Sequence, residues 1–143
     1  GVKNTPVEIN EITAPIIMWR KEYRCDSGGP GEYRGGLGQI MEFEHADGQS
    51  MIVSKMFDRV IHPARGLAGG AAGATGGAGL SDGTVLSGMG RDEIPGGQRL
   101  VIETPGGGGK GNPVNRNPES LQADIRAGLV SEEAAKSVYG RNK

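Results

Sequence analysis

Glycine supplies 27 of the 143 residues, and this excess limits what the chain can fold into. Core-forming side chains are scarce, because Leu, Ile, Val and Phe together supply only 28 residues. Ordering one residue costs about 1–2 kcal/mol of backbone entropy, and glycine costs the most. A disordered chain is the alternative, but disorder normally also requires a high net charge. We therefore expect a fold that is incomplete until partner polypeptides complete its core.

The charge balance and the cysteine content narrow the class of protein. A formal net charge of −1 gives no indication of nucleic acid or of an anionic membrane surface as the main target. The sequence contains no apolar run near the roughly 20 residues that a membrane helix needs. Cys25 is the single cysteine, so it cannot form an internal disulfide, which agrees with a reducing compartment. We expect a cytoplasmic location.

Alternating polar and apolar residues predict short antiparallel strands. In residues 16–25, Ile17, Trp19, Tyr23 and Cys25 would share one face of a strand. Further strands are expected at 37–45, at 50–57 with both faces covered, at 84–87 and at 98–103. Asp47-Gly48 suits a tight hairpin turn between the second and third strands, and Asp82-Gly83 precedes the fourth. Residues 66–79 are nearly all Gly and Ala and are expected to form a loop rather than a core strand; a flexible linker is the alternative.

The C-terminal part predicts a pair of short α-helices. Asn117 is a candidate N-cap, Pro118 fits the first helical position, and Leu121, Ile125 and Leu129 recur at helical spacing, with Gly128 as the C-cap. Ser131 would cap a second helix at 132–139 that Gly140 ends. The chain is thus expected to be one mainly β domain, with a β-rich part at 1–105, a Gly-rich connection at 106–116 and the helical pair at 117–140.

Few residues suggest catalysis. His45 and His62 lack the spacing of metal ligands, so we expect no metal site and regard both as structural. Cys25 lies between Arg24 and Asp26, whose effects on a thiol oppose each other, so a small buried side chain is expected. The glycine clusters at 26–31, 34–38 and 104–111 allow either close backbone packing or an anion-binding nest. Residues 104–111 include Lys110 but lack the order of a phosphate loop, because Asn112 follows Gly111.

The order of the motifs carries a resemblance to a known family. The motifs are Asn4-Thr5-Pro6-Val7-Glu8, residues 26–38 from Asp26-Ser27-Gly28-Gly29-Pro30-Gly31 to Gly38, Gly66-Leu67-Ala68-Gly69-Gly70, and Glu103-Thr104-Pro105 with the glycines at 106–109. The last motifs are Asp124-Ile125-Arg126-Ala127-Gly128-Leu129-Val130-Ser131, then Ala134-Ala135 and Val138-Tyr139-Gly140. This set resembles the C-terminal portion of hydantoinase B/oxoprolinase subunits and covers essentially the whole chain. Lys110 and Asn112 replace the family's usual aromatic residue and aspartate. Functions that depend on those two side chains are therefore not carried over.

The resemblance implies a system that uses ATP to activate a carbonyl or an amide. It implies ATP and a divalent cation such as Mg²⁺ on partner subunits, and no cofactor bound by this chain. The implied partners are hydantoinase A-like and truncated hydantoinase B-like subunits. The upstream part of the family subunit is not in this sequence, so we expect a separate small subunit, as in an arrangement of the acetophenone carboxylase type.

Three functions follow as hypotheses. The first is a non-catalytic structural subunit of an ATP-dependent carboxylase of an aromatic ketone, converting acetophenone to benzoylacetate with bicarbonate. The second is a subunit of an ATP-dependent hydantoinase, oxoprolinase or lactamase, and the third is an autonomous Gly-rich binding module. No residue is assigned a catalytic role. The candidate ligand neighbours are Asp26, Arg34, Gly106, Gly107, Gly108 and Gly109, and the expected interface or packing anchors are Trp19, Tyr23, Tyr33 and Tyr139.

Overall fold

The computed structural model describes residues 4–140 and is built from short antiparallel strands joined by Gly-rich segments, with two short helices near the C-terminus. The expected mainly β fold class is confirmed. One sheet has the strand order β1-β2-β7-β4-β5, and a separate two-stranded ribbon pairs β3 with β6. The strands are β1 (Ile16–Tyr23), β2 (Gln39–His45), β3 (Met51–Met56), β4 (Gly77–Leu80), β5 (Val85–Leu86), β6 (Met89–Ile94) and β7 (Leu100–Glu103).

The cross-strand register gives the five-stranded sheet one apolar and one charged face. Met18 of β1, Phe43 of β2, Leu100 of β7 and Leu80 of β4 lie opposite one another in a single row. Arg20, Glu42 and Val101 form a row on the other face, where Arg20 and Glu42 are paired at 3.4 Å. This alternation is what a half-buried antiparallel sheet requires.

Strand β1 differs from the expected pattern because it contains a bulge. Met18 pairs with Phe43 and Arg20 with Glu42, so Trp19 has no partner on β2. An extra residue inverts the alternation beyond it. The prediction that Ile17, Trp19, Tyr23 and Cys25 share one face is therefore wrong: Ile17 lies opposite Glu44 and Tyr23 opposite Gln39, which are on different faces of β2. Trp19 is 52% and Tyr23 61% exposed. Cys25 is exposed as well, which corrects its expected burial.

The turn at Asp47-Gly48 forms, but it does not close a hairpin. Gly48 has φ 66° and its N–H donates to His45 O at 3.0 Å. Strand β2 is already paired on both edges, with β1 and with β7, so β3 leaves the sheet and pairs with β6. Strand β3 also has one exposed face rather than the two covered faces expected, since Ile52 and Met56 point to solvent.

Part of the Gly/Ala region is a strand, which corrects the expectation of a loop. Strand β4 lies inside the sheet between β7 and β5, and its Ala78 is buried. Main-chain pairing on both edges holds this strand, so it does not depend on large side chains. Strand β6 and helix α1 (Val7–Thr13) were not expected, and α1 has no buried residue.

The helical pair is present near its expected positions. Helix α2 (Pro118–Arg126) starts at Asn117, whose side chain accepts from Ser120 N, and Gly128 beyond its end has φ 69°. Helix α3 (Glu132–Ser137) starts at Ser131, whose hydroxyl accepts from Ala134 N at 3.0 Å, and ends before the expected Tyr139. A short 3₁₀ helix, η1 (Pro113–Asn115), precedes α2. The pair encloses its own apolar cluster of Leu121, Val130, Ala135 and Tyr139.

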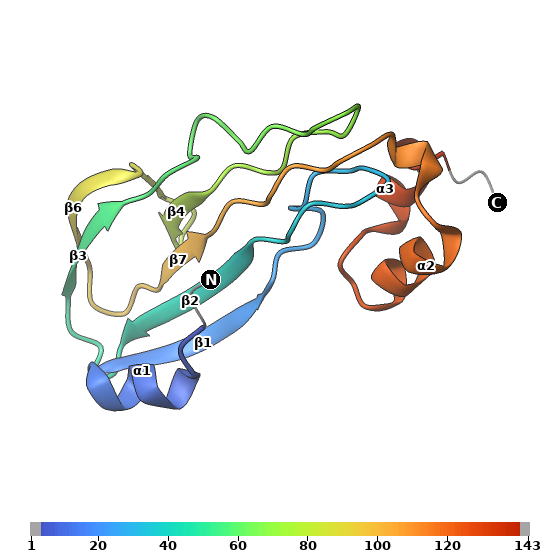
Figure 1. Cartoon of the computed structure of the whole chain (residues 1–143). Helices are drawn as coiled ribbons and strands as arrows, with labels where there is room; N and C mark the ends of the chain where they lie inside the picture. Colours follow the sequence, from blue (N-terminus) through green and yellow to red (C-terminus); the bar gives the residue numbers. More distant parts are fainter. Residues whose placement is uncertain (1–3, 141–143) are drawn as a thin grey trace.

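Between the sheet and the helical pair, extended Gly-rich segments run side by side (Figure 1). We call these segments, residues 27–31, 33–38, 64–76 and 104–111, the glycine mesh. The last segment bonds to all the others: Gly29 N donates to Gly107 O at 2.8 Å, Gly107 N to Gly36 O at 2.8 Å, and Gly109 N to Ala71 O at 2.9 Å. The mesh therefore links sheet to helices through backbone hydrogen bonds rather than through an apolar core.

No helix among residues 4–140 combines the length and the apolar character that crossing a membrane would require.

Candidate functional site

The candidate site residues meet where the glycine mesh contacts the helical pair. Asp124 of α2 accepts from Arg34 Nε at 3.1 Å and from Arg116 Nη2 at 2.5 Å. The side chains of Asp124, Arg34 and Arg116 are 12%, 15% and 10% exposed, so solvent screens these pairs little. Arg116 Nη1 also donates to Glu32 O at 3.3 Å. The three side chains form a nearly buried clasp between the mesh and α2.

Asp26 makes a second connection to the helical pair. Its Oδ1 accepts from Ser131 N at 2.9 Å, at the start of α3. Its own N–H donates to Leu129 O at 3.1 Å, and its φ of 57° is tolerated best by Gly, Asn and Asp. A carboxylate at a helix N-terminus is stabilised by the helix dipole. Asp26 thus holds the linker between α2 and α3 against the mesh.

The four glycines at 106–109 lie in the most crowded part of the mesh. A Cβ would lie 1.7 Å from Ser27 O at Gly106, 2.1 Å from Arg65 O at Gly108 and 2.2 Å from Pro30 O at Gly109. Gly107 is less tight, because the atom nearest to its Cβ would be Gly36 N at 3.1 Å. No side chain fits at the distances found at Gly106, Gly108 and Gly109, so close backbone packing accounts for these three glycines.

Most backbone N–H groups of residues 104–111 are bonded to carbonyl oxygens. Gly106 N donates to Ala74 O at 3.0 Å and Lys110 N donates to Tyr33 O at 2.9 Å; Gly107 N and Gly109 N are bonded to the carbonyls of Gly36 and Ala71. An anion nest needs free N–H groups that converge on one point, and these donors are already paired with carbonyls. The Lys110 ammonium lies 5.9 Å from the centre of the Tyr33 ring, and both residues are exposed.

Of the remaining titratable candidates, His45 has a local hydrogen-bond partner. His45 Nδ1 accepts from Asp47 N at 3.2 Å, within the turn after β2. Although Cys25 is exposed, desolvation of its thiol by neighbouring atoms, and then the Asp26 carboxylate, raise the pKa of the thiol, which disfavours the reactive thiolate. Among residues 4–140, no three His, Cys, Asp or Glu side chains gather as a metal-ligand group.

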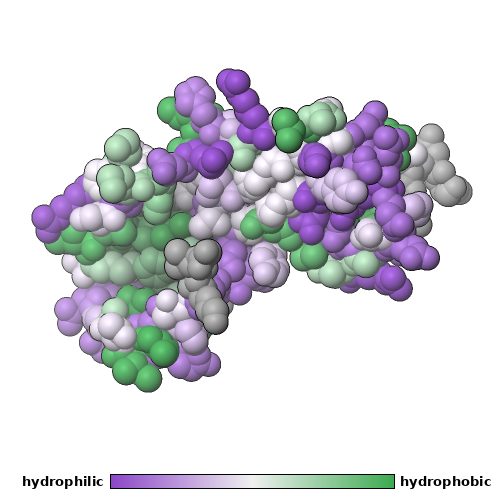
Figure 2. Space-filling model, viewed as in Figure 1, coloured by the Kyte–Doolittle hydropathy of each residue, from purple (hydrophilic) through white to green (hydrophobic). Residues whose placement is uncertain are grey.

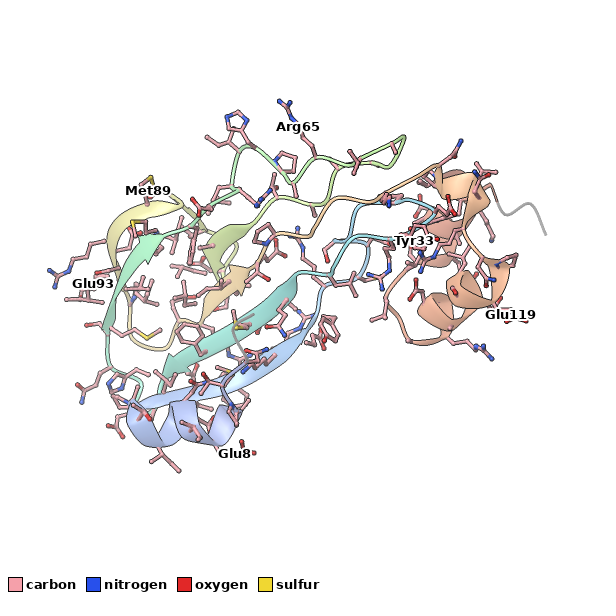
Figure 3. The ribbon with its side chains drawn as sticks, viewed as in Figure 1. Glu8, Tyr33, Arg65, Met89, Glu93 and Glu119 are labelled. Atoms are coloured by element: carbon pink, nitrogen blue, oxygen red, sulfur yellow. The ribbon has the colours of Figure 1, made fainter. Side chains whose placement is uncertain are left out.

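The four aromatic anchors divide into two kinds. Tyr139 is buried in the cluster of the helical pair, where burial raises the pKa of its phenol. Trp19, Tyr23 and Tyr33 are more than half exposed, and Arg99 stacks over the Trp19 ring at 4.4 Å. Tyr33 lies where the mesh reaches the helical pair (Figure 3). Tyr139 is thus a packing residue, while an interface role for the other three stays a prediction.

A hollow of about 370 Å³ beside the clasp is lined by Arg34, Arg116, Asn117 and Ser120, with Glu32, Tyr33 and Asn115. Sequence reasoning did not single out Arg116 or Asp124 as site residues. Arg116 lies in an irregular connection, and Asp124 resembles any other polar residue of an amphipathic helix. A ligand near Asp26, Arg34 or the glycines at 106–109 stays a prediction.

The fold and the mesh define a β-rich unit whose Gly-rich segments pack through their backbones. Residues 1–113 match the family model described as hydantoinase B/oxoprolinase, and the chain belongs to the hydantoinase B/oxoprolinase family.

Individual relatives are much longer than this chain. It is 30% identical to the beta subunit of the caprolactamase of Pseudomonas jessenii over 94% of its own length and 24% of that protein's. It is also 30% identical to the B subunit of a putative D-/L-hydantoinase of Pseudomonas sp. (strain NS671), over 98% of its own length and 24% of that protein's. The chain therefore spans about a quarter of these relatives.

Solved structures contain the same fold. The crystal structure of the ATP-dependent caprolactamase from Pseudomonas jessenii superposes with a TM-score of 0.72 and 28% identity, over 94% of this chain and 24% of that chain. The nucleotide-free acetone carboxylase structure superposes with a TM-score of 0.80, over 95% of this chain and 23% of that chain. At 21% identity, the second likeness concerns the fold alone.

Proposed function

We propose that this chain is a non-catalytic, structural part of an ATP-dependent enzyme of the hydantoinase and oxoprolinase type. The observation that carries the proposal is that the candidate site residues make contacts within the chain itself. Arg34 and Asp26 each bond to the helical pair, and Gly106, Gly108 and Gly109 pack against carbonyl oxygens. In this function the chain holds a fixed surface beside the reaction centre and donates no reacting group.

ATP and its divalent cation, such as Mg²⁺, belong in this proposal to a hydantoinase A-type partner subunit. Support comes from the paired N–H groups of residues 104–111, which leave no set of free donors there for a phosphate. A hydantoinase B-type segment completes the assembly, either on the same polypeptide or on a separate one.

A cyclic amide is the substrate class that we favour. The relatives at 30% identity are named for caprolactam and hydantoin, both of which are cyclic amides. An aromatic ketone such as acetophenone, carboxylated with bicarbonate, is the second candidate, because a ketone carboxylase has the same fold.

Activity per assembled complex tests the structural assignment. Asp26→Asn and Arg34→Lys should lower the yield of complex but leave its kcat and KM unchanged, measured as ADP formed with caprolactam, hydantoin, 5-oxoproline, or acetophenone plus bicarbonate. Trp19→Ala should likewise impair assembly more than chemistry. An intact complex that has lost its kcat in any of the three variants would assign a catalytic role to this chain.

A further inference from the structure

The two ends of the molecule differ in how well they bury apolar side chains. Among residues 4–140, four of the seven buried hydrophobic residues belong to the cluster of the helical pair. Ala78, Ile94 and Leu100 are the only hydrophobic residues buried in the described strands, although the strands contain more residues than the helices. The helical end therefore has a core of its own, whereas the sheet end does not.

The outer face of the β3–β6 ribbon is the clearest unfinished surface. Met56 lies directly opposite Met89, and Ile52 opposite Glu93, so these side chains share one face. Met56 is 83%, Met89 68% and Ile52 58% exposed. Met89 points away from the rest of the protein (Figure 3). The inner face is closed by the fully buried Ile94 and by Lys55, which pairs with Asp92.

Helix α1 adds a second apolar surface at the same end of the molecule (Figure 1). It has seven residues and none is buried, while Ile9 and Ile12 are exposed. Apolar residues gather over α1 and over the ribbon side in the space-filling view (Figure 2). A helix this short is marginal in water without a surface to pack on, and a two-stranded ribbon is equally marginal alone.

We propose that the outer face of the β3–β6 ribbon, together with α1, is the docking surface for the remaining three quarters of a hydantoinase B-type subunit. This inference rests on the proposed function. In the solved caprolactamase, the matching unit makes up 24% of a longer chain, so the occupant is polypeptide that the fold normally accompanies. Arg91 and Glu93 balance each other in charge on this face, so the Met56–Met89 pair and the exposed isoleucines supply the attraction.

Oxidative footprinting of the assembled enzyme tests the surface directly. The hydantoinase B-type segment is expressed from the gene that encodes it, which is either the gene of this chain or a neighbouring gene. Met56 and Met89 should react with hydroxyl radical far more slowly in the assembly than in the chain alone, because burial protects a thioether. Leu67 and Val114, which are 66% and 64% exposed in the mesh and in η1, are matched controls and should stay reactive.

Substitutions give an independent measurement. Met56→Ser with Met89→Ser should weaken recovery of the hydantoinase B-type segment by about a hundredfold or more, since each buried apolar side chain contributes about one factor of ten or more. Leu67→Ser with Val114→Ser should leave recovery unchanged. Equal oxidation of Met56 and Met89 with and without the segment would overturn the proposal, as would protection caused by a second copy of this chain alone. A protected but inactive assembly would refute the proposed function and keep the docking surface.

Discussion

Gly35 and Gly36 are neighbours in the chain but have different surroundings. A Cβ on Gly35 would lie 2.0 Å from Gly107 O, whereas a Cβ on Gly36 would meet no atom within 4 Å. Gly35→Ala should therefore destabilise the mesh by about 1–3 kcal/mol or more. Gly36→Ala should be neutral or stabilising by up to about 1 kcal/mol. Amide hydrogen exchange of residues 104–111 measures both effects, and equal exchange in the two variants would contradict close packing at Gly35.

Tyr139 makes the helical pair sensitive to alkaline pH. Burial raises the pKa of its phenol above the ordinary value of 10.0, although the Arg116 guanidinium acts in the opposite direction. The unfolded chain releases this proton first, so the stability that Tyr139 contributes is complete below pH 10.0 and is lost as the pH rises further. Urea unfolding across roughly pH 9–11 should show this loss. Tyr139→Phe should reduce it, whereas the exposed control Tyr33→Phe should not.

At the scale of elements, the ion pairs of the clasp fix the position of α2 against the mesh. Asp124→Asn would leave Arg34 and Arg116 nearly buried beside an uncharged amide, and Arg116 Nε already has no partner among the described residues. Breaking a buried ion pair from one side costs about 3–5 kcal/mol. We expect rapid hydrogen exchange throughout α2 in this variant. Glu132→Gln, which removes an exposed pair with Lys136 at 4.0 Å, should change stability by less than about 1 kcal/mol.

Elements defined by local chemistry could be predicted from the sequence. The capping residues Asn117 and Ser131 and the alternation before His45 placed two helices and a strand correctly. Elements defined by distant partners could not. Strand β4 is held by main-chain bonds to β7 and β5, and the bulge at Trp19 depends on the register against β2. The clasp escaped prediction for the same reason, because 90 residues separate Arg34 from Asp124.

At the scale of the whole molecule, the glycine mesh replaces an apolar core in the middle of the chain. Its segments approach one another so closely that carbonyl oxygens occupy the space where side chains would lie. Hydrogen bonds between buried backbone groups contribute a modest net stability each, about 0.5–1.5 kcal/mol. The glycine content that made an independent fold doubtful is therefore also what lets the mesh pack. The sheet end buries few side chains, so it gains less free energy to offset its own ordering.

The isolated chain should consequently unfold from one end. We expect amides of α1, β3 and β6 to exchange fast, and those of the mesh and the helical pair to exchange slowly, because the mesh segments are bonded to one another through their backbones and the helical pair has a buried apolar cluster. Adding the hydantoinase B-type segment should slow exchange in the first group and raise the melting temperature with concentration. The measurement is hydrogen exchange by mass spectrometry, compared with a thermal melt of the same sample. A single cooperative transition at high temperature, with uniform protection from Val7 to Ser137, would mean that the sheet end is complete without a partner.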